Sequence, residues 1–239
     1  MKNSYQKDSF IGLSHRGNSK KFIENSFEAF NSVIQMGYKF IETDLRMTLD
    51  KEVIAFHDPD LKRLFNLDLQ VKDLTFNEIN NLFREKNCRL LTLEEAFKEF
   101  PSINFNLDLK VKEVINESID IVSDLNAFDK VCFASFRDSH TEKVLQHNQN
   151  ANVSMGMKGV ALFKFFKFHN KKIKIIQIPL EWNSIKVLTR NLIERAHKSN
   201  LLVHVWTIND RKTINNLIDL GVNGIVTDEP ELLIEIMKE

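Results

Sequence analysis

Two acids stand two residues apart in the segment IETDLRMTLDKEVIAFHD. Glu42 and Asp44 lie in a run typical of a strand, where residues i and i+2 project from the same face. Two carboxylates held this close repel each other, so one pKa rises unless a cation lies between them. Mg²⁺ and Ca²⁺ are hard ions that prefer such oxygen ligands. The pair therefore indicates a metal site, although a bare pair of this type can also be two exposed carboxylates at a sheet edge.

Further charged residues stand at the ends of other predicted strands. Asp108 and Lys110 form a second i, i+2 pair in NFNLDLKV, and Arg16 follows the run FIGLSH. The carboxyl ends of barrel strands meet at one rim, where barrel enzymes carry out their chemistry. Asp108 is therefore a candidate third metal ligand. Arg16 is a candidate phosphate partner, because a guanidinium binds oxygens bidentately.

Two histidines belong to the same set. His15 ends the first predicted strand, and His57 ends a later one beside Asp58, which could orient its ring. Imidazoles titrate near neutral pH, so two of them beside a metal are suited to general acid and general base roles. Each histidine alone is more often structural. Their occurrence with three acids and two cations favours a catalytic site, and the other five histidines are expected to be structural.

Short β-branched and aromatic runs alternate with segments of helical periodicity. The predicted strands are Phe10–His15, Lys39–Met47, Glu52–His57, Ile103–Val111, Lys130–Ser135, Asn152–Gly156, Ile173–Pro179, Leu201–Thr207 and Gly224–Thr227. The first helix is predicted to begin near Asn25, with Glu28 three positions on as in a capping box, and to end at Gly37. Further helices are predicted over Leu93–Phe100, Glu113–Leu125, Ser139–Asn148, Leu188–Lys198, Arg211–Leu220 and Pro230–Lys238.

This alternation over 239 residues predicts an α/β fold with a parallel sheet, and eight repeats point to a (β/α)8 TIM barrel. The surplus strand, Glu52–His57, follows a connection too short for a crossover helix. It is therefore predicted to fold back as a hairpin that sets His57 opposite Asp44. Residues 60–91 are predicted to form a small insertion after this hairpin strand. The whole chain, residues 1–239, is interpreted as one barrel domain.

Composition argues against several classes of protein. Lys plus Arg equals Asp plus Glu at 33 each, so no net charge drives the chain toward nucleic acid. The two cysteines suggest no disulfide framework, and the polar N-terminus lacks a signal-peptide core. No run approaches the roughly 20 apolar residues that span a bilayer. These features predict a cytoplasmic protein. No GxSxG elbow, Walker loop or HExxH motif indicates a different chemistry.

The pattern HRG, ENSFEAF and IETDLRMTLDKEVIAFHDPDLKR resembles the opening of the glycerophosphodiester phosphodiesterases. The likeness continues in order through DLTFNEI, LLTLEEAF, FNLDLK, ASF, VHVWTIND and GVNGIVTDEP, and it is weakest over residues 138–185. The resemblance implies a barrel with a small insertion and one divalent ion, Mg²⁺ or Ca²⁺. It also implies hydrolysis of small-molecule glycerophosphodiesters to sn-glycerol 3-phosphate and an alcohol, within lipid and glycerol metabolism.

The resemblance further implies a role for each matching residue. The implied metal ligands are Glu42, Asp44 and Asp108, the acid–base pair is His15 and His57, the phosphate partners are Arg16 and Lys110, and the pocket residues are Phe136 and Trp206. The chain departs from the family in two places. The third ligand is usually the Glu of ELK, and Asp108 is one methylene shorter, so a metal must lie closer to it or be reached through water. Ile23 replaces the usual Pro.

Several alternatives stay open at this point. The nucleophile is either water or the substrate's own glycerol 2-hydroxyl, which would give a cyclic phosphate, and either histidine could be the base. A lysophospholipase D-type enzyme acting on lysophospholipids at a membrane surface would use the same site. A non-catalytic binding module on the same barrel is less consistent with the intact set of site residues. The oligomeric state is not indicated.

The segment Lys158–Lys174 mixes phenylalanines with lysines. Its aromatic residues are Phe163, Phe165, Phe166 and Phe168. A basic aromatic segment of this kind could contact an anionic bilayer surface as a peripheral membrane protein does. The interpretation that the sequence favours is an ordinary helix, in which the phenylalanines pack on the barrel and the lysines face solvent.

Overall fold

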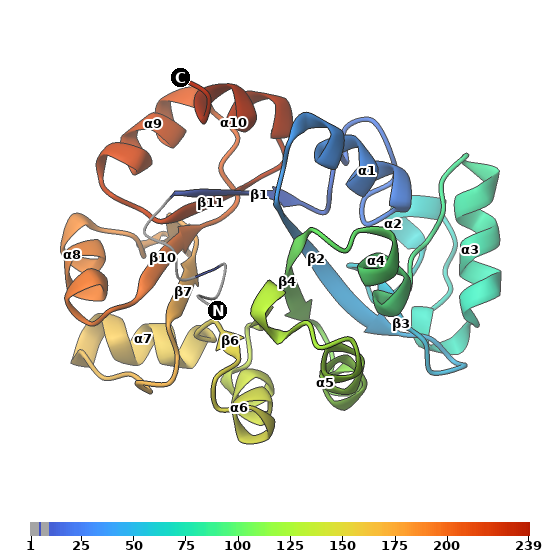
Figure 1. Ribbon diagram of the computed structural model, residues 1–239, viewed down its shortest axis with the longest axis horizontal. Coiled ribbons are helices and arrows are strands. Elements are labelled where there is room, and N and C mark those ends of the chain that lie inside the picture. Colours follow the sequence, from blue (N-terminus) through green and yellow to red (C-terminus); the bar gives the residue numbers. More distant parts are fainter. Residues whose placement is uncertain (1–4, 6–9) are drawn as a thin grey trace.

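Eight parallel strands surround one axis in the computed structural model, which describes residue 5 and residues 10–239 (Figure 1). In their order around the barrel they are β6 (Asn152–Val153), β5 (Val131–Ala134), β4 (Asn104–Leu109), β2 (Phe40–Met47), β1 (Ile11–His15), β11 (Gly224–Thr227), β10 (Leu202–Val205) and β7 (Ile175–Ile178). The gap between β6 and β7 is bridged by Ser154 and Ile175. The predicted (β/α)8 barrel is confirmed, and each predicted strand is present.

Helices cover the outside of this barrel (Figure 1). They are α1 (Phe27–Met36), α4 (Leu93–Glu99), α5 (Val114–Asp124), α6 (Asp138–His147), α7 (Met157–Phe166), α8 (Arg190–Lys198), α9 (Arg211–Asp219) and α10 (Pro230–Ile236). Their apolar faces pack on the strands and form one large core, in which Phe30, Phe105 and Phe133 are fully buried. Thr92 illustrates how the helices begin, because it caps α4 reciprocally with Glu95.

The predicted N-cap of the first helix, Asn25, is off by one residue. Helix α1 begins at Phe27, and its N-cap is Ser26, whose side chain accepts a hydrogen bond from the Ala29 amide. Ser26 has the extended backbone that an N-cap requires, whereas Asn25 has a left-handed φ of 61°. Glu28 therefore does not complete a capping box with Asn25. Gly37 ends the helix as predicted, with a φ of 106°.

The predicted hairpin is present, but its register differs by one residue. Strand β3 (Val53–Ala55) pairs antiparallel with β2, and the Phe56 amide donates to the Asp44 carbonyl. Phe56, not His57, is therefore opposite Asp44. The cause is a three-residue turn: the Thr48 amide donates to the Glu52 carbonyl across it, and Lys51 adopts a φ of 69°. Such a turn ends in a left-handed residue and shifts the pairing relative to a two-residue turn.

A small subdomain follows this hairpin on the side of the barrel (Figure 1). It contains α2 (Lys62–Phe65), the 3-10 turn η2 (Val71–Asp73) and α3 (Phe76–Glu85). A second hydrophobic cluster joins its residues Ile79 and Phe83 to Phe56 at the end of the hairpin. The division of the chain into one barrel domain with an insertion at residues 60–91 stays a prediction.

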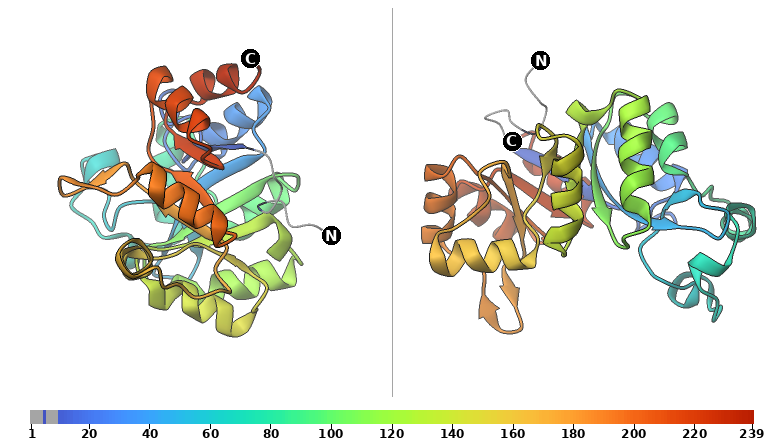
Figure 2. Two further views of the ribbon diagram at one scale, coloured as in Figure 1. Left: turned by 90° about the vertical axis from the view of Figure 1, so that its left-hand side faces the viewer. Right: turned by 90° about the horizontal axis from the view of Figure 1, so that it is seen from below.

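A second hairpin was not predicted. Strands β8 (Glu181–Trp182) and β9 (Ile185–Lys186) pair antiparallel around Asn183 and Ser184. Both views in Figure 2 show this hairpin and the insertion projecting from the same end of the barrel. The hairpin follows β7 directly, so it lies at the carboxyl end of that strand, where barrels hold their sites.

Candidate active site

One cavity of about 420 Å³ opens at the carboxyl ends of the barrel strands. All the site residues predicted from the sequence line it: His15, Arg16, Glu42, Asp44, His57, Asp108, Lys110, Phe136 and Trp206. They come from segments up to 191 positions apart in the chain, and the barrel brings them together because its strands are parallel. The charged residues lie on one side of the cavity and the aromatic residues on the other.

Three buried carboxylates form the centre of the charged side. Oxygens of Glu42, Asp44 and Asp108 lie within 4.8 Å of one another. Glu42 and Asp44 project together from β2, as the i, i+2 spacing predicts. Asp108 lies on the neighbouring strand β4 directly beside Asp44 in the parallel register. Asp108 therefore reaches the same cluster with a side chain one methylene shorter than the Glu that the resemblance implies.

Two cations neutralise part of this cluster. The Lys110 ammonium lies 2.8 Å from Asp44 Oδ1 and 2.6 Å from Asp108 Oδ2, and Arg16 Nε lies 2.9 Å from Asp44 Oδ2. Burial disfavours the ionised form of Asp44, but Lys110 and Arg16 outweigh it and lower its pKa to about 2. Asn25 adds a hydrogen bond of 3.2 Å to Asp44 Oδ2 from the loop that precedes α1.

The remaining carboxylate oxygens lack such partners. Glu42 Oε2 and Asp108 Oδ1 are buried, and neither has a hydrogen-bond partner among the described residues. Burial and the neighbouring charge of Asp44 raise the pKa of Glu42. Burial also raises the pKa of Asp108, despite the ion pair with Lys110. A buried oxygen without a donor is costly, and a divalent ion is the partner that three carboxylates suit. The residues therefore fit the implied metal ion.

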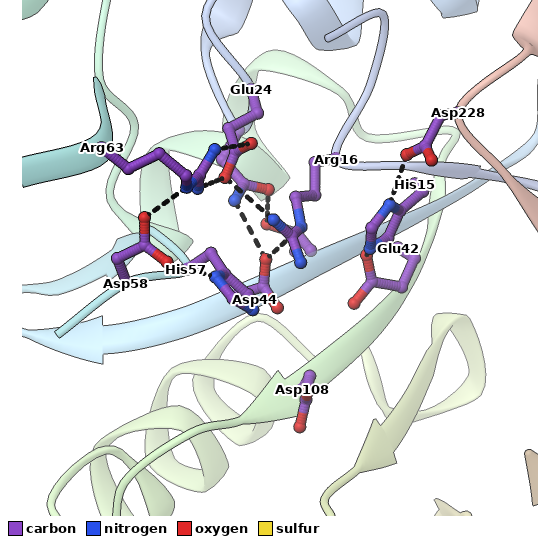
Figure 3. A network of polar contacts seen from close by, with 12 residues as sticks. His15, Arg16, Glu24, Glu42, Asp44, His57, Asp58, Arg63, Asp108 and Asp228 are labelled. Carbon is purple, nitrogen blue, oxygen red and sulfur yellow. Dashed lines mark hydrogen bonds and ion pairs between the residues drawn. The ribbon is translucent and has the colours of Figure 1, made fainter. Parts of the chain in front are cut away.

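His15 is oriented by Asp228, a residue that the sequence analysis did not predict. Its Nδ1 donates to Asp228 Oδ1 at 2.6 Å, and its Nε2 lies 3.8 Å from Glu42 Oε2 (Figure 3). Burial lowers the pKa of His15, but the bond to Asp228 and the charge of Glu42 raise it more, so the net shift is upward. Asn209 donates to the other oxygen of Asp228 and fixes that carboxylate. Sequence reasoning missed Asp228, although it follows β11 as a strand-end acid in GIVTDEP.

His57 is held in a similar way by its sequence neighbour. Its Nδ1 donates to Asp58 Oδ1 at 2.7 Å, as the HD pair suggested. Burial lowers the pKa of His57 and outweighs the nearby carboxylates. In both histidines Nδ1 is therefore hydrogen-bonded to a carboxylate, and Nε2 is the ring nitrogen that can exchange a proton with a substrate. The two rings lie on opposite sides of Asp44 in Figure 3.

The insertion contributes to the charged side through Arg63. Its guanidinium donates to Asp58 Oδ2 at 2.6 Å and to both oxygens of Glu24 at 2.6 and 2.9 Å. Glu24 also accepts from Arg16 at 3.0 Å (Figure 3). A continuous network thus connects the insertion to the carboxylate cluster. Neither Glu24 nor Arg63 was predicted, because no local pattern relates residues 39 positions apart.

The opposite side of the cavity is aromatic and aliphatic. The ring of Phe136 lies 5.6 Å from that of Trp206, centre to centre, and 5.7 Å from that of Trp182 on the β8–β9 hairpin. Met155, Met157 and other apolar residues extend this surface. The sequence predicted Phe136 and Trp206 here, and it missed the hairpin that carries Trp182.

The phenylalanines of α7 do not all pack on the barrel. Phe163 is buried, but the exposed fractions of Phe165, Phe166 and Phe168 are 66%, 74% and 66%. The interpretation of this segment as an ordinary barrel helix with buried phenylalanines is therefore wrong for three of its four rings. Among residue 5 and residues 10–239, no helix has the length and apolar character to span a bilayer.

Comparisons with known proteins show similarity to phosphodiesterases over most of the chain. Residues 15–181 and 128–232 match the model of the glycerophosphoryl diester phosphodiesterase family. The chain is 25% identical over 238 residues to a probable glycerophosphodiester phosphodiesterase of Mycobacterium tuberculosis, covering 95% of this chain and 90% of that protein. It is 24% identical to a human lysophospholipase D, covering 92% of this chain and 84% of that one.

A solved structure is similar over the same range. The crystal structure of glycerophosphodiester phosphodiesterase from Thermotoga maritima superposes with a TM-score of 0.75 and 26% sequence identity. The similarity covers 95% of this chain and 98% of that one, so it extends through the barrel and the insertion.

Proposed function

The chain belongs to the glycerophosphoryl diester phosphodiesterase family, and from this premise we propose how it hydrolyses glycerophosphodiesters. The products are sn-glycerol 3-phosphate and an alcohol. The observation that carries the proposal is the cluster of three buried carboxylates between two oriented histidines. Such a cluster suits a divalent ion that stabilises negative charge on phosphate oxygens, and it would be a costly arrangement in a core without that use.

The carboxylates Glu42, Asp44 and Asp108 would hold one divalent ion, Mg²⁺ or Ca²⁺. When bound, this ion supplies positive charge for the phosphate oxygens as negative charge builds up on them. Arg16 and Lys110 face the same space and add hydrogen bonds to those oxygens. Their ion pairs with Asp44 keep both side chains oriented before substrate arrives.

The two histidines would move the protons. One imidazole takes a proton from the attacking oxygen, which is water or the glycerol 2-hydroxyl, and the bond from phosphorus to the leaving alcohol breaks. The other imidazole gives a proton to that leaving oxygen, so protons balance over the step. Asp228 and Asp58 hold the rings through Nδ1 and keep Nε2 directed to the substrate. Attack by the 2-hydroxyl gives a cyclic phosphate, which water then opens in a second step.

A panel of glycerophosphodiesters tests this proposal. Glycerophosphocholine and glycerophosphoethanolamine are assayed with Mg²⁺, Ca²⁺ and Mn²⁺, and glycerol 3-phosphate is quantified as the product. We expect release of glycerol 3-phosphate that stops in EDTA and returns on adding a divalent ion. Full activity in EDTA would refute the metal, and no product from any diester would refute the substrate class.

The apolar side of the cavity favours a second candidate function, cleavage of lysophospholipids. A lysophospholipid has the same phosphodiester but carries an acyl chain on the glycerol, and the surface formed by Phe136, Trp182 and Trp206 would bury part of that chain. Hydrolysis would release the headgroup alcohol and leave lysophosphatidic acid. Choline release from lysophosphatidylcholine, compared with release from glycerophosphocholine, separates the two candidates. A strict preference for the water-soluble diester would exclude the second.

A further inference from the structure

Exposed apolar side chains gather along one edge of the cavity mouth, which we name the aromatic rim. The rim consists of Met157, Phe165, Phe166 and Phe168 from α7 and its C-terminal turn, and of Trp182 and Ile185 from the β8–β9 hairpin. Met157, Phe165, Trp182 and Ile185 also line the cavity, so the rim is continuous with its apolar side. Exposed apolar side chains that cluster beside a cavity and among polar residues indicate an interaction site.

The charge around the aromatic rim is strongly positive. Residues 157–186 contain seven lysines and a single acid, Glu181, although the whole chain carries no net charge. The lysines are Lys158, Lys164, Lys167, Lys171, Lys172, Lys174 and Lys186. Lys164 donates to the Lys186 carbonyl and so attaches α7 to the hairpin, while Lys167, Lys171 and Lys172 are exposed. Along the chain, these cations are interspersed with the exposed rings.

We propose that the aromatic rim docks on an anionic lipid bilayer. Aromatic side chains insert at the boundary between headgroups and acyl chains, and lysines beside them contact anionic headgroups. The positive charge of the lysines beside the rim favours an anionic bilayer as its partner. A second copy bound through the same surface would place seven lysines against seven lysines, because a two-fold interface is self-complementary.

Docking through the aromatic rim has a consequence for the cavity. Because Phe165, Trp182 and Ile185 belong both to the rim and to the cavity lining, a bilayer there would border the mouth. An amphiphilic phosphodiester could then enter with its chain along the apolar side, and this consequence rests on the proposed function for lysophospholipids. The docking itself does not depend on catalysis, so binding and turnover are measured separately.

Co-sedimentation with vesicles tests the docking. The full chain is mixed with vesicles of phosphatidylcholine containing phosphatidylglycerol, and with vesicles of phosphatidylcholine alone, at low and high salt. We expect binding to the anionic vesicles that weakens as salt rises, because screening reduces the lysine contribution. The double variant Phe166→Ser/Phe168→Ser should bind about tenfold more weakly, and the triple variant Lys167→Gln/Lys171→Gln/Lys172→Gln about a hundredfold more weakly at low salt.

Matched variants control for non-specific binding of exposed apolar residues to vesicles. Leu49 and Leu69 are exposed apolar residues outside the rim, so Leu49→Ser/Leu69→Ser should keep full vesicle binding. Phe166 and Phe168 do not line the cavity, so their double variant should keep full turnover of glycerophosphocholine. No binding of the parent chain to anionic vesicles at low salt would overturn the proposal. So would a dimer in ultracentrifugation that the Phe166→Ser/Phe168→Ser change dissociates, because it would assign the rim to self-association.

Discussion

The two sides of the cavity mouth differ in how firmly their side chains are held. On the charged side, formed at the ends of β1, β2 and β4, ion pairs hold His15, Arg16 and Lys110 against carboxylates. On the apolar side, formed by α7, the β8–β9 hairpin, Phe136 and Trp206, several large side chains are exposed. The charged side is fixed before substrate arrives, whereas the apolar side is left available for contact.

This difference indicates that the charged side serves catalysis and the apolar side serves binding. Electrostatic catalysis depends on charges and hydrogen bonds that do not reorganise during the reaction, and the network from Arg63 through Glu24 and Arg16 to Asp44 supplies such rigidity. Binding of an apolar chain or of a lipid surface needs area more than fixed geometry. Changes on the charged side should therefore act on kcat for all substrates. Changes on the apolar side should act on KM, and only for amphiphilic ones.

The largest expected effect is from His57→Ala. We expect kcat to fall about 10³-fold for glycerophosphocholine and lysophosphatidylcholine alike, since proton transfer by a positioned side chain contributes roughly 10² to 10⁴. The melting temperature should change little, because the ring is partly exposed and its hydrogen bond is to the neighbouring side chain of Asp58. His147→Ala on α6 is the control and should retain activity. Unaltered turnover in His57→Ala would refute the assigned role.

Asp108→Asn should have the next largest effect. The change keeps the size of the side chain but removes one of the three carboxylate charges, so the concentration of Mg²⁺ or Ca²⁺ for half-maximal activity should rise about 10- to 100-fold. Metal titration by calorimetry gives a second measure that does not require turnover. Asp108→Glu keeps the charge and should bind metal far better than Asp108→Asn. Equal metal affinity in these two variants would contradict the assignment of Asp108 as a ligand.

The elements that the sequence predicted well share a local signal. The barrel strands are short β-branched or aromatic runs separated by helical periodicity, and this alternation is sufficient to indicate a barrel. Glu42 and Asp44 were recognisable because strand geometry alone places them on one face. Asp108 was expected beside them because neighbouring parallel strands end at the same rim, and its register with Asp44 follows that expectation.

The features that were missed depend on contacts between distant segments or on turn geometry. Asp228 reaches His15 across 213 residues, and no local pattern reveals that pair. The β8–β9 strands have only two residues each, too few for an alternating pattern, and their turn signal is Asn183-Ser184 with both φ values positive. The exposure of Phe165 and Phe166 could not be predicted from the sequence either. A helix with apolar residues on several faces does not show which face packs on the barrel.

A smaller effect is expected from Asp228→Asn. Asp228 does not face the substrate in the proposed mechanism but orients His15, so kcat should fall about tenfold while KM for glycerophosphocholine stays unchanged. The carboxylate in Asp228→Glu can still accept from Nδ1 and should recover part of the loss. A rise in KM with unchanged kcat would place Asp228 in substrate binding and would weaken the contrast between the two sides.

Trp182→Ala should have the smallest effect and the most selective one. Its ring contributes apolar contact to one side of the cavity, and losing part of that contact costs about 1 kcal/mol, or roughly a fivefold rise in KM for lysophosphatidylcholine. Glycerophosphocholine has no acyl chain, so its KM should not change. Phe22→Ala is a matched control, since Phe22 is as exposed as Trp182 at 38% but does not line the cavity. A rise in KM for both substrates would show that the apolar side positions the phosphodiester itself, and the division between the two sides would then fail.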